Sequence, residues 1–167
     1  TLNSAGLDHD EGPDKDAGFG PYVQSERKHL YRPFAEELVK SGHAYYCFCE
    51  KSEEPTTEAG TVFLDGCPSR CADLSPAEVK AKLDAGIPYV IRQKIDRTGS
   101  VSFRDLVFGE ITIETKVLDD QILIKQDGMP TYNFANVIDD HLMQITHVVR
   151  GSEYLSSTPK YNLLYQA

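Results

Sequence analysis

Residues 132–159 decide the fold, and they read YNFANVIDDHLMQITHVVRGSEYLSSTP. The first part, Tyr132 to Leu142, is predicted to be helical, and the apolar run at 145–149 predicts a short buried strand. Thr158 and Pro159 predict the start of a last helix, as its cap and its first helical position. This alternation of helix and strand is typical of a parallel sheet covered by helices.

Upstream of this stretch the sequence predicts an α+β block. A helix is expected from Ser25 to a stop at Gly42, with a kink or a late start because Pro33 lies inside it. Ser75, Pro76 and Glu78 form a capping box for a second helix, which Gly86 ends. Strands are expected at 44–49, 89–95, 101–103, 110–115 and 121–125, an irregular loop at 50–66, and a tight turn at Asp127-Gly128.

Length and charge narrow the class of protein. The 167 residues carry a formal net charge of −9, with 40% hydrophobic and 26% charged residues, which is typical of a folded domain of one or two small cores. No apolar run is long enough for a membrane span and no signal sequence is visible, so we expect a cytoplasmic protein that does not bind membranes. The negative net charge argues against general binding to nucleic acid, so we do not expect DNA as a partner. The cations that could form a local nucleic-acid patch are Arg92, Lys94, Arg97 and Arg104; the alternative is solvated charges on the outer face of a sheet.

Four cysteines form two close pairs on either side of a loop. Cys47 and Cys49 are followed, after seventeen residues, by Cys67 and Cys71. Two pairs of thiolates can satisfy a tetrahedral zinc ion, and a cytosolic protein disfavours disulfides. The alternative is four thiols without metal, two of them buried in a strand as small hydrophobic groups.

Several motifs together resemble the bacterial glutamyl-tRNA synthetases, which are class I aminoacyl-tRNA synthetases. The motifs are GPYVQSER at 20–27, AYYCFC at 44–49, LDD at 118–120, YNFAN at 132–136, DDHLM at 139–143, ITHVVRG at 145–151 and LSSTP at 155–159. The resemblance covers nearly the whole chain and implies an internal fragment of the catalytic region. It implies an α/β fold: part of a Rossmann-like nucleotide-binding domain with an inserted α+β domain that contacts the tRNA acceptor stem.

The resemblance also implies a division of the chain into three parts. Residues 1–20 would end the first half of the catalytic domain, residues 21–120 would form the inserted domain with its zinc loop at 47–71, and residues 121–167 would begin the second half. The cations Arg92, Lys94, Arg97 and Arg104 would then face tRNA.

Candidate substrate-binding residues follow from the same motifs. Arg150, at the end of the predicted strand, has the planar fork that anchors a carboxylate. Tyr132 and Asn136 share one helix face and, by resemblance, contact glutamate. Glu153 and Tyr154 match positions beside the ATP adenosine, although many relatives have His or Trp at the second position. Asp139, Asp140 and His141 point in different directions, so we expect structural ion pairs there rather than a metal site.

The metal site departs from the pattern of relatives that bind structural zinc. Where those relatives have a histidine two positions after the last cysteine, this chain has Asp73, and it carries the additional Cys67. We therefore expect zinc to be held by Cys47, Cys49, Cys67 and Cys71 in a closed structural site. Catalysis in this family depends on positioning and charge stabilisation without a covalent enzyme intermediate, so neither Cys47 nor Cys49 is expected to act as a nucleophile.

Two ATP-binding motifs of these synthetases, a His-x-Gly-His type and a Lys-Met-Ser-Lys type, do not occur in the 167 residues. The parent enzyme is expected to activate L-glutamate with ATP and Mg²⁺ and to esterify the 3′ end of tRNA(Glu), while this piece alone is expected to be inactive. One alternative is a paralogue that attaches glutamate to a modified base, a glutamyl-queuosine tRNA(Asp) synthetase. Another is a free-standing zinc-stabilised RNA-binding module without catalysis.

Overall fold

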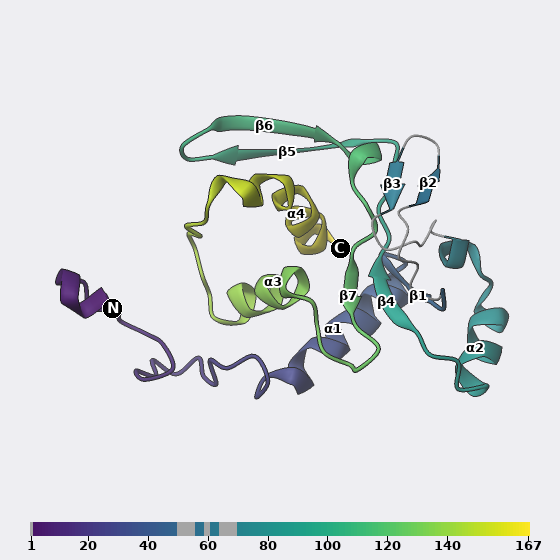
Figure 1. The fold of residues 1–167 in the computed structure, drawn as a ribbon, viewed down its shortest axis with the longest axis horizontal. Coiled ribbons are helices and arrows are strands. Elements are labelled where there is room, and N and C mark those ends of the chain that lie inside the picture. The colour runs from purple at the N-terminus through teal and green to yellow at the C-terminus, as the bar shows by residue number, and fades with distance from the viewer. Residues whose placement is uncertain (1, 50–55, 59–60, 64–69) are drawn as a thin grey trace.

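The fold centres on a three-stranded antiparallel sheet. A computed structural model of the chain describes residues 2–49, 56–58, 61–63 and 70–167 (Figure 1). The sheet has the order β1-β4-β7, built from β1 (Ala44–Cys47), β4 (Val90–Gln93) and β7 (Ile122–Ile124). Tyr45 pairs with Arg92 across the first ladder, and Ile91 pairs with Ile124 across the second.

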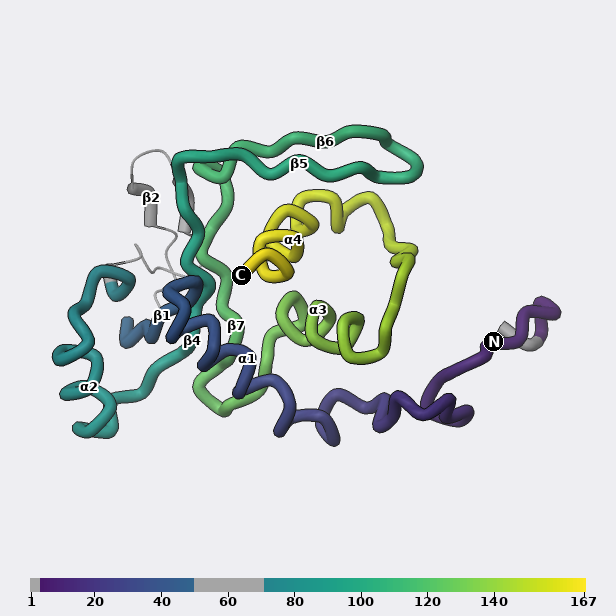
Figure 2. The backbone as a smooth tube through the Cα atoms, turned by 180° about the vertical axis from the view of Figure 1, so that it is seen from behind, coloured from purple at the N-terminus to yellow at the C-terminus, as the bar shows by residue number. Residues whose placement is uncertain are grey.

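The other described strands form two separate antiparallel hairpins. β5 (Ser100–Asp105) pairs with β6 (Gly109–Glu114), and this long hairpin lies beside α4 (Thr158–Gln166) in Figures 1 and 2. β2 (Thr56–Glu58) pairs with β3 (Thr61–Phe63) inside the segment expected to be an irregular loop, so that expectation was wrong for these six residues. Side-chain composition alone did not reveal a hairpin among so many Glu, Thr, Pro and Gly residues.

Helix α1 (Lys28–Ser41) begins three residues after Ser25, but this start is not late enough to place Pro33 in the first turn. It continues through Pro33 and ends at Gly42, whose positive φ of 84° lets the Gly42 and His43 amides bond the carbonyls of Val39 and Leu38. Helix α2 (Pro76–Asp84) has both bonds of the predicted capping box, from Ser75 and Glu78. Short 3₁₀ turns occur at Leu2–Ala5, Arg70–Asp73, Thr115–Val117 and Ser152–Ser156.

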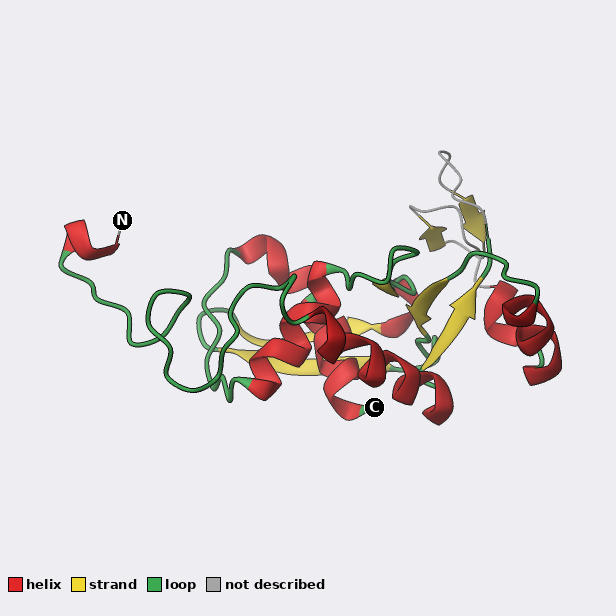
Figure 3. Cartoon of the chain, turned by 90° about the horizontal axis from the view of Figure 1, so that it is seen from below, coloured by secondary structure: helices red, strands yellow, loops and turns green. Residues whose placement is uncertain are grey.

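Helix α3 (Tyr132–Leu142) has the predicted bounds, and α4 has Pro159 in its first turn with Ser157 as its N-cap. Thr158 is therefore a helical residue rather than the cap. Figure 3, which views the chain from below, shows the N-terminal segment leading away from the other elements, and Figure 1 shows α2 on the opposite side of the sheet from α3 and α4. Within the described residues, no helix is both long and apolar enough to cross a bilayer.

The strand predicted at 145–149 is not formed. Ile145, Val148 and Val149 are 46%, 54% and 99% exposed, and these residues have neither helical nor strand structure. A strand needs a neighbouring backbone to satisfy its N–H and C=O groups, and within the described residues no backbone pairs with this segment. All strand pairs in the described part of the chain are antiparallel, so the parallel sheet expected after residue 127 is not found there.

One hydrophobic core joins elements from both ends of the chain. Its buried members come from α1, β1, β4, β7, α3 and α4; they include Tyr31, Ala44, Ile91, Leu123, Phe134 and Tyr161. The predicted boundary between residues 120 and 121 separates β4 from β7, which lie side by side in one sheet. The three-part division stays a prediction.

Candidate functional site

The candidate site begins on one face of α3. Tyr132, Asn136 and Asp140 are each four residues apart, so they follow one another along the same face. Tyr132 lies in the first turn and is 54% exposed, whereas Asn136 is 9% exposed. Within the described residues, neither the Oδ1 nor the Nδ2 of Asn136 has a hydrogen-bond partner, although both atoms are buried.

Arg150 faces this stripe of α3. Its guanidinium carbon lies 5.7 Å from the ring centre of Tyr132, 5.4 Å from that of Tyr154 and 5.3 Å from that of Tyr161. Its Nη2 is 3.6 Å from an Asp140 carboxylate oxygen, and its side chain is 19% exposed. Since Arg150 contacts residues one turn before and one turn after Asn136, the three predicted glutamate-binding residues lie in one region.

Burial shapes the electrostatics of this region. Loss of solvent raises the pKa of Asp140, while the positive charge of Arg150 opposes the increase. The Tyr132 phenol, by its charge and hydrogen bond, raises the pKa of Tyr154, and the two rings lie 6.0 Å apart. Tyr154 therefore stays a neutral donor near pH 7, beside the permanent cation of Arg150.

Glu153 and Tyr154 lie in the 3₁₀ turn Ser152–Ser156. Tyr154 is partly buried against Arg150, and Glu153 is exposed. The Glu153 carboxylate folds back over Gly151, into the space that a Cβ at this position would occupy. Glu153 and Tyr154, which the sequence predicted to lie beside adenosine, are therefore next to Tyr132 and Arg150, because the Tyr154 ring contacts both.

Asp139 has the structural role that the sequence indicated. Its carboxylate accepts hydrogen bonds from Arg27 Nε at 2.7 Å and from the Tyr31 hydroxyl at 2.9 Å. Arg27 is 2% exposed and also donates to the carbonyls of Phe19 and Pro21. Sequence reasoning missed Arg27 and Tyr31, because the pairing spans more than a hundred residues and has no local signal.

Three of the predicted metal ligands come together. The sulfur atoms of Cys47, Cys49 and Cys71 lie within 4.8 Å of one another, and those of Cys49 and Cys71 are 3.6 Å apart. This is too long for a disulfide and close to the ~3.8 Å between sulfurs that share a tetrahedral zinc with ~2.3 Å bonds. The Phe48 amide also donates to the Cys71 sulfur. Cys67, the fourth predicted ligand, lies outside the described residues.

The four predicted tRNA-facing cations do not form one exposed patch. Arg92 is 5% exposed and its Nη1 donates to the Asp120 carbonyl, so the expectation that its charge reaches the surface was wrong. Arg97 pairs with the buried Asp120 carboxylate at 2.7 Å. Lys94 and Arg104 are exposed. Arg92 thus lies buried in β4, a position that the charge of its side chain did not lead us to expect.

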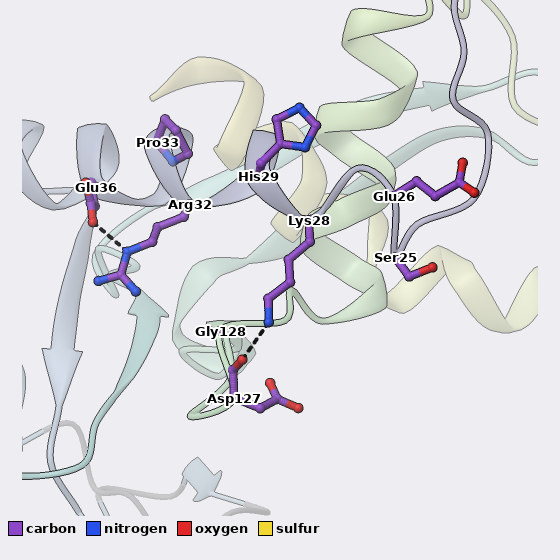
Figure 4. Close-up of a pocket in the computed structure, with 9 residues that line it drawn as sticks. All are labelled: Ser25, Glu26, Lys28, His29, Arg32, Pro33, Glu36, Asp127 and Gly128. Atoms are coloured by element: carbon purple, nitrogen blue, oxygen red, sulfur yellow. Dashed lines mark hydrogen bonds and ion pairs between the residues drawn. The ribbon is translucent and has the colours of Figure 1, made fainter.

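A separate groove of about 780 Å³ lies along α1 (Figure 4). Its lining residues include the charged side chains of Lys28, Arg32, Glu36 and Asp127, together with His29. Lys28 donates a hydrogen bond to the Asp127 backbone carbonyl, and Arg32 forms an ion pair with Glu36. The two cations of the groove therefore already have partners within the chain. The groove shares no lining residue with the Arg150 cluster.

Comparisons with known proteins show which family this chain resembles. A glutamate–tRNA ligase of Lachnoclostridium phytofermentans is 57% identical over all of this chain, and one of Clostridium acetobutylicum is 58% identical. The chain covers 36% and 35% of these relatives, so it spans about a third of their length. A crystal structure of a glutamate tRNA ligase from Elizabethkingia meningosepticum, in complex with its amino acid, is also similar, with a TM-score of 0.84 and 38% sequence identity. The match covers 99% of this chain and 35% of the ligase chain.

The fold is therefore the α/β fold of a class I synthetase catalytic domain, of which this chain supplies one portion. The family model for the catalytic domain of class I tRNA synthetases (E and Q) matches residues 2–167. With nearly every residue matched, the chain belongs to the tRNA synthetases class I (E and Q), catalytic domain family.

Proposed function

We propose that this chain is part of a glutamate–tRNA ligase and carries one wall of its glutamate pocket. The observation that carries the proposal is the buried carboxamide of Asn136, which has no hydrogen-bond partner within the described residues. Leaving such a group unpaired costs roughly 1–3 kcal/mol, so native proteins rarely do it without a ligand or water to complete it. A bound amino acid offers both an ammonium donor and carboxylate acceptors to this amide.

Arg150 supplies the anchor for a glutamate carboxylate. Its guanidinium is mostly buried and lies beside three tyrosine rings, which take up none of its N–H groups, so these groups stay available for a bidentate bond. Tyr132, exposed at the start of α3, adds a phenol donor at the rim. With one carboxylate held this way, the α-carboxylate is free to attack the α-phosphate of ATP, giving glutamyl-adenylate and pyrophosphate.

ATP with Mg²⁺ is the second substrate of the parent enzyme, and Glu153 and Tyr154 are the residues of this chain proposed to lie beside its adenosine. Transfer of the glutamyl group to the 3′ end of tRNA(Glu) completes the reaction. These residues act by holding and orienting the reactants, and no covalent enzyme intermediate is needed. The cytoplasm is the compartment where such a reaction would take place.

Glutamate-dependent ATP–pyrophosphate exchange by the parent enzyme tests the pocket. Arg150→Ala should reduce kcat/KM for glutamate by about 100-fold or more, because losing one partner of a buried charged pair costs roughly 3 kcal/mol. Asn136→Ala should reduce it by about 10-fold or more. Lys80→Ala is the control, since this exposed cation pairs with Asp84 on its own helix, α2, and should leave exchange unchanged. Normal exchange in both site variants would remove these residues from the pocket.

Zinc is proposed as a structural component. Cys47, Cys49 and Cys71 would supply three thiolates and Cys67 the fourth, and the ion would brace β1 against the turn at Arg70–Asp73. We expect one zinc per chain in protein purified without chelator, and less than a tenth of this in Cys49→Ser. A full zinc content in Cys49→Ser would contradict the ligand set.

For tRNA, Lys94 and Arg104 remain the candidate phosphate contacts, because both are exposed. Arg92 and Arg97 are proposed to have a structural role, because both bind Asp120: Arg92 its backbone carbonyl and Arg97 its carboxylate. The isolated 167-residue chain is proposed not to catalyse exchange, and glutamate-dependent exchange by that chain alone would contradict this.

A further inference from the structure

Tyr161 is a buried residue of the core that also reaches the candidate pocket. It lies on α4, is 7% exposed, and its hydroxyl donates to the Asn133 side chain of α3 at 2.7 Å. Its ring centre is 5.3 Å from the guanidinium carbon of Arg150, the shortest of the three tyrosine distances. None of the sequence motifs discussed above assigned it a role.

Arg150 depends on side-chain contacts because its own backbone is weakly held. It lies in the segment 143–151, which is neither helix nor strand, and Val149 beside it is fully exposed. Within the described residues, the amides of Met143, Gln144 and Ile145 bond the end of α3, and the Tyr154 amide bonds the Gly151 carbonyl, but no backbone bond holds residues 146–150 between them. The position of the guanidinium is therefore decided by what its side chain touches.

Those contacts differ in what they demand from the guanidinium. An aromatic ring attracts a cation through its negative face and takes up none of the N–H donors. A carboxylate takes up donors directly, and Asp140 stands at 3.6 Å from Nη2, beyond a normal hydrogen bond. Tyr161 thus holds the Arg150 guanidinium while leaving its N–H donors free for a ligand. Asp140 compensates the positive charge of Arg150 without a close hydrogen bond to it.

We propose that Tyr161 is a positioning residue for glutamate recognition, which holds the Arg150 guanidinium in place through its ring. The inference rests on the proposed glutamate pocket. It assigns the ring, and not the hydroxyl, as the group that acts on Arg150. Without that ring, Arg150 samples more rotamers before glutamate binds, and affinity falls because this freedom is lost on binding.

The test uses full-length enzyme and glutamate-dependent exchange, with KM measured for L-glutamate and for ATP. Tyr161→Leu should raise KM for glutamate by roughly 3- to 30-fold, the range expected for loss of a partly desolvated cation–π contact, with KM for ATP changed less than about twofold. Tyr161→Phe keeps the ring and should stay within about twofold of wild type for both. Tyr46→Leu, which removes a partly buried tyrosine of β1 whose ring packs edge-to-face on Tyr89, is the matched control and should leave both constants unchanged.

A double-mutant cycle separates positioning from general packing. If Tyr161 acts through Arg150, Tyr161→Leu should have little further effect on KM for glutamate in an Arg150→Ala background. Thermal unfolding checks that each variant folds; should Tyr161→Leu not fold, Tyr161→Met fills similar space without an aromatic face.

The proposal is overturned by a wild-type KM for glutamate in folded Tyr161→Leu or Tyr161→Met. Equal increases in both KM values, or a Tyr161→Phe variant as impaired as Tyr161→Leu, would overturn it too. If wild-type enzyme shows no glutamate-dependent exchange, the proposed function itself fails. If exchange is normal in Arg150→Ala, the assignment of Arg150 fails, and these results are distinct from a failure of Tyr161.

Discussion

Single residues connect distant parts of this chain through the carboxylate of Asp139. It accepts bonds from Arg27 and Tyr31, both buried on or beside α1, and so joins α1 to α3. Burial, with the Asp139 hydrogen bond as the second cause, raises the pKa of Tyr31 to about 12. The neutral phenol is therefore favoured in the folded state more than in the unfolded chain, where it ionises near pH 10.

The prediction at this scale concerns stability at alkaline pH. The contribution of Tyr31 is fully present below about pH 10, where both states carry the proton, and is lost as pH rises from about 10 to about 12. Urea unfolding of Tyr31→Phe at pH 7 should give a free energy about 1 kcal/mol lower than wild type. Between pH 10 and 12 wild type should lose roughly 2 kcal/mol more than the variant. Parallel curves for the two proteins would show that Tyr31 does not titrate in this way.

Among the elements, α2 depends most on local sequence signals. No residue of this helix is buried, so its stability owes little to tertiary packing. The Ser75 hydroxyl accepts the Glu78 amide, and the Glu78 carboxylate accepts the Ser75 amide and hydroxyl. These bonds satisfy donors that the first helical turn leaves open.

Ser75→Ala should therefore destabilise α2 by about 1 kcal/mol. Amide hydrogen exchange should become faster in the first turn, at Glu78 and Val79, with little change in α3. Ser25→Ala, an exposed serine outside any helix, serves as the control and should leave exchange in α2 unaltered. Unchanged protection of α2 in Ser75→Ala would contradict a capping role.

For the whole molecule, one core crosses the predicted domain boundary. Ile91 on β4 and Phe134 on α3 are both fully buried in the same cluster. Substituting either with alanine should lower the free energy of unfolding by about 2–5 kcal/mol. Because the core is shared, both variants should shift a single cooperative urea transition of this chain, followed by circular dichroism and by tyrosine fluorescence. Two separable transitions, each shifted by one variant only, would instead support independent units at 21–120 and 121–167.

Local sequence determined the elements whose signals lie within a few residues. The capping box of α2, the bounds of α3, the end of α1 at Gly42 and the turn at Asp127-Gly128 all agree with the structure. In each of them the backbone groups form hydrogen bonds with residues nearby in sequence, so the local sequence is enough to predict the element. Part of the candidate site was visible for the same reason, since Tyr132 and Asn136 are one helical turn apart.

Tertiary structure alone decided the rest. The β1-β4-β7 order, the burial of Arg92 and the Arg27–Asp139 pair depend on partners distant in sequence. The apolar run at 145–149 shows the limit most clearly: its composition favours a strand, but strand structure requires a second backbone, and no described backbone pairs with it. Likewise Tyr161 joins the site only because α4 packs against α3, which places an aromatic face beside Arg150.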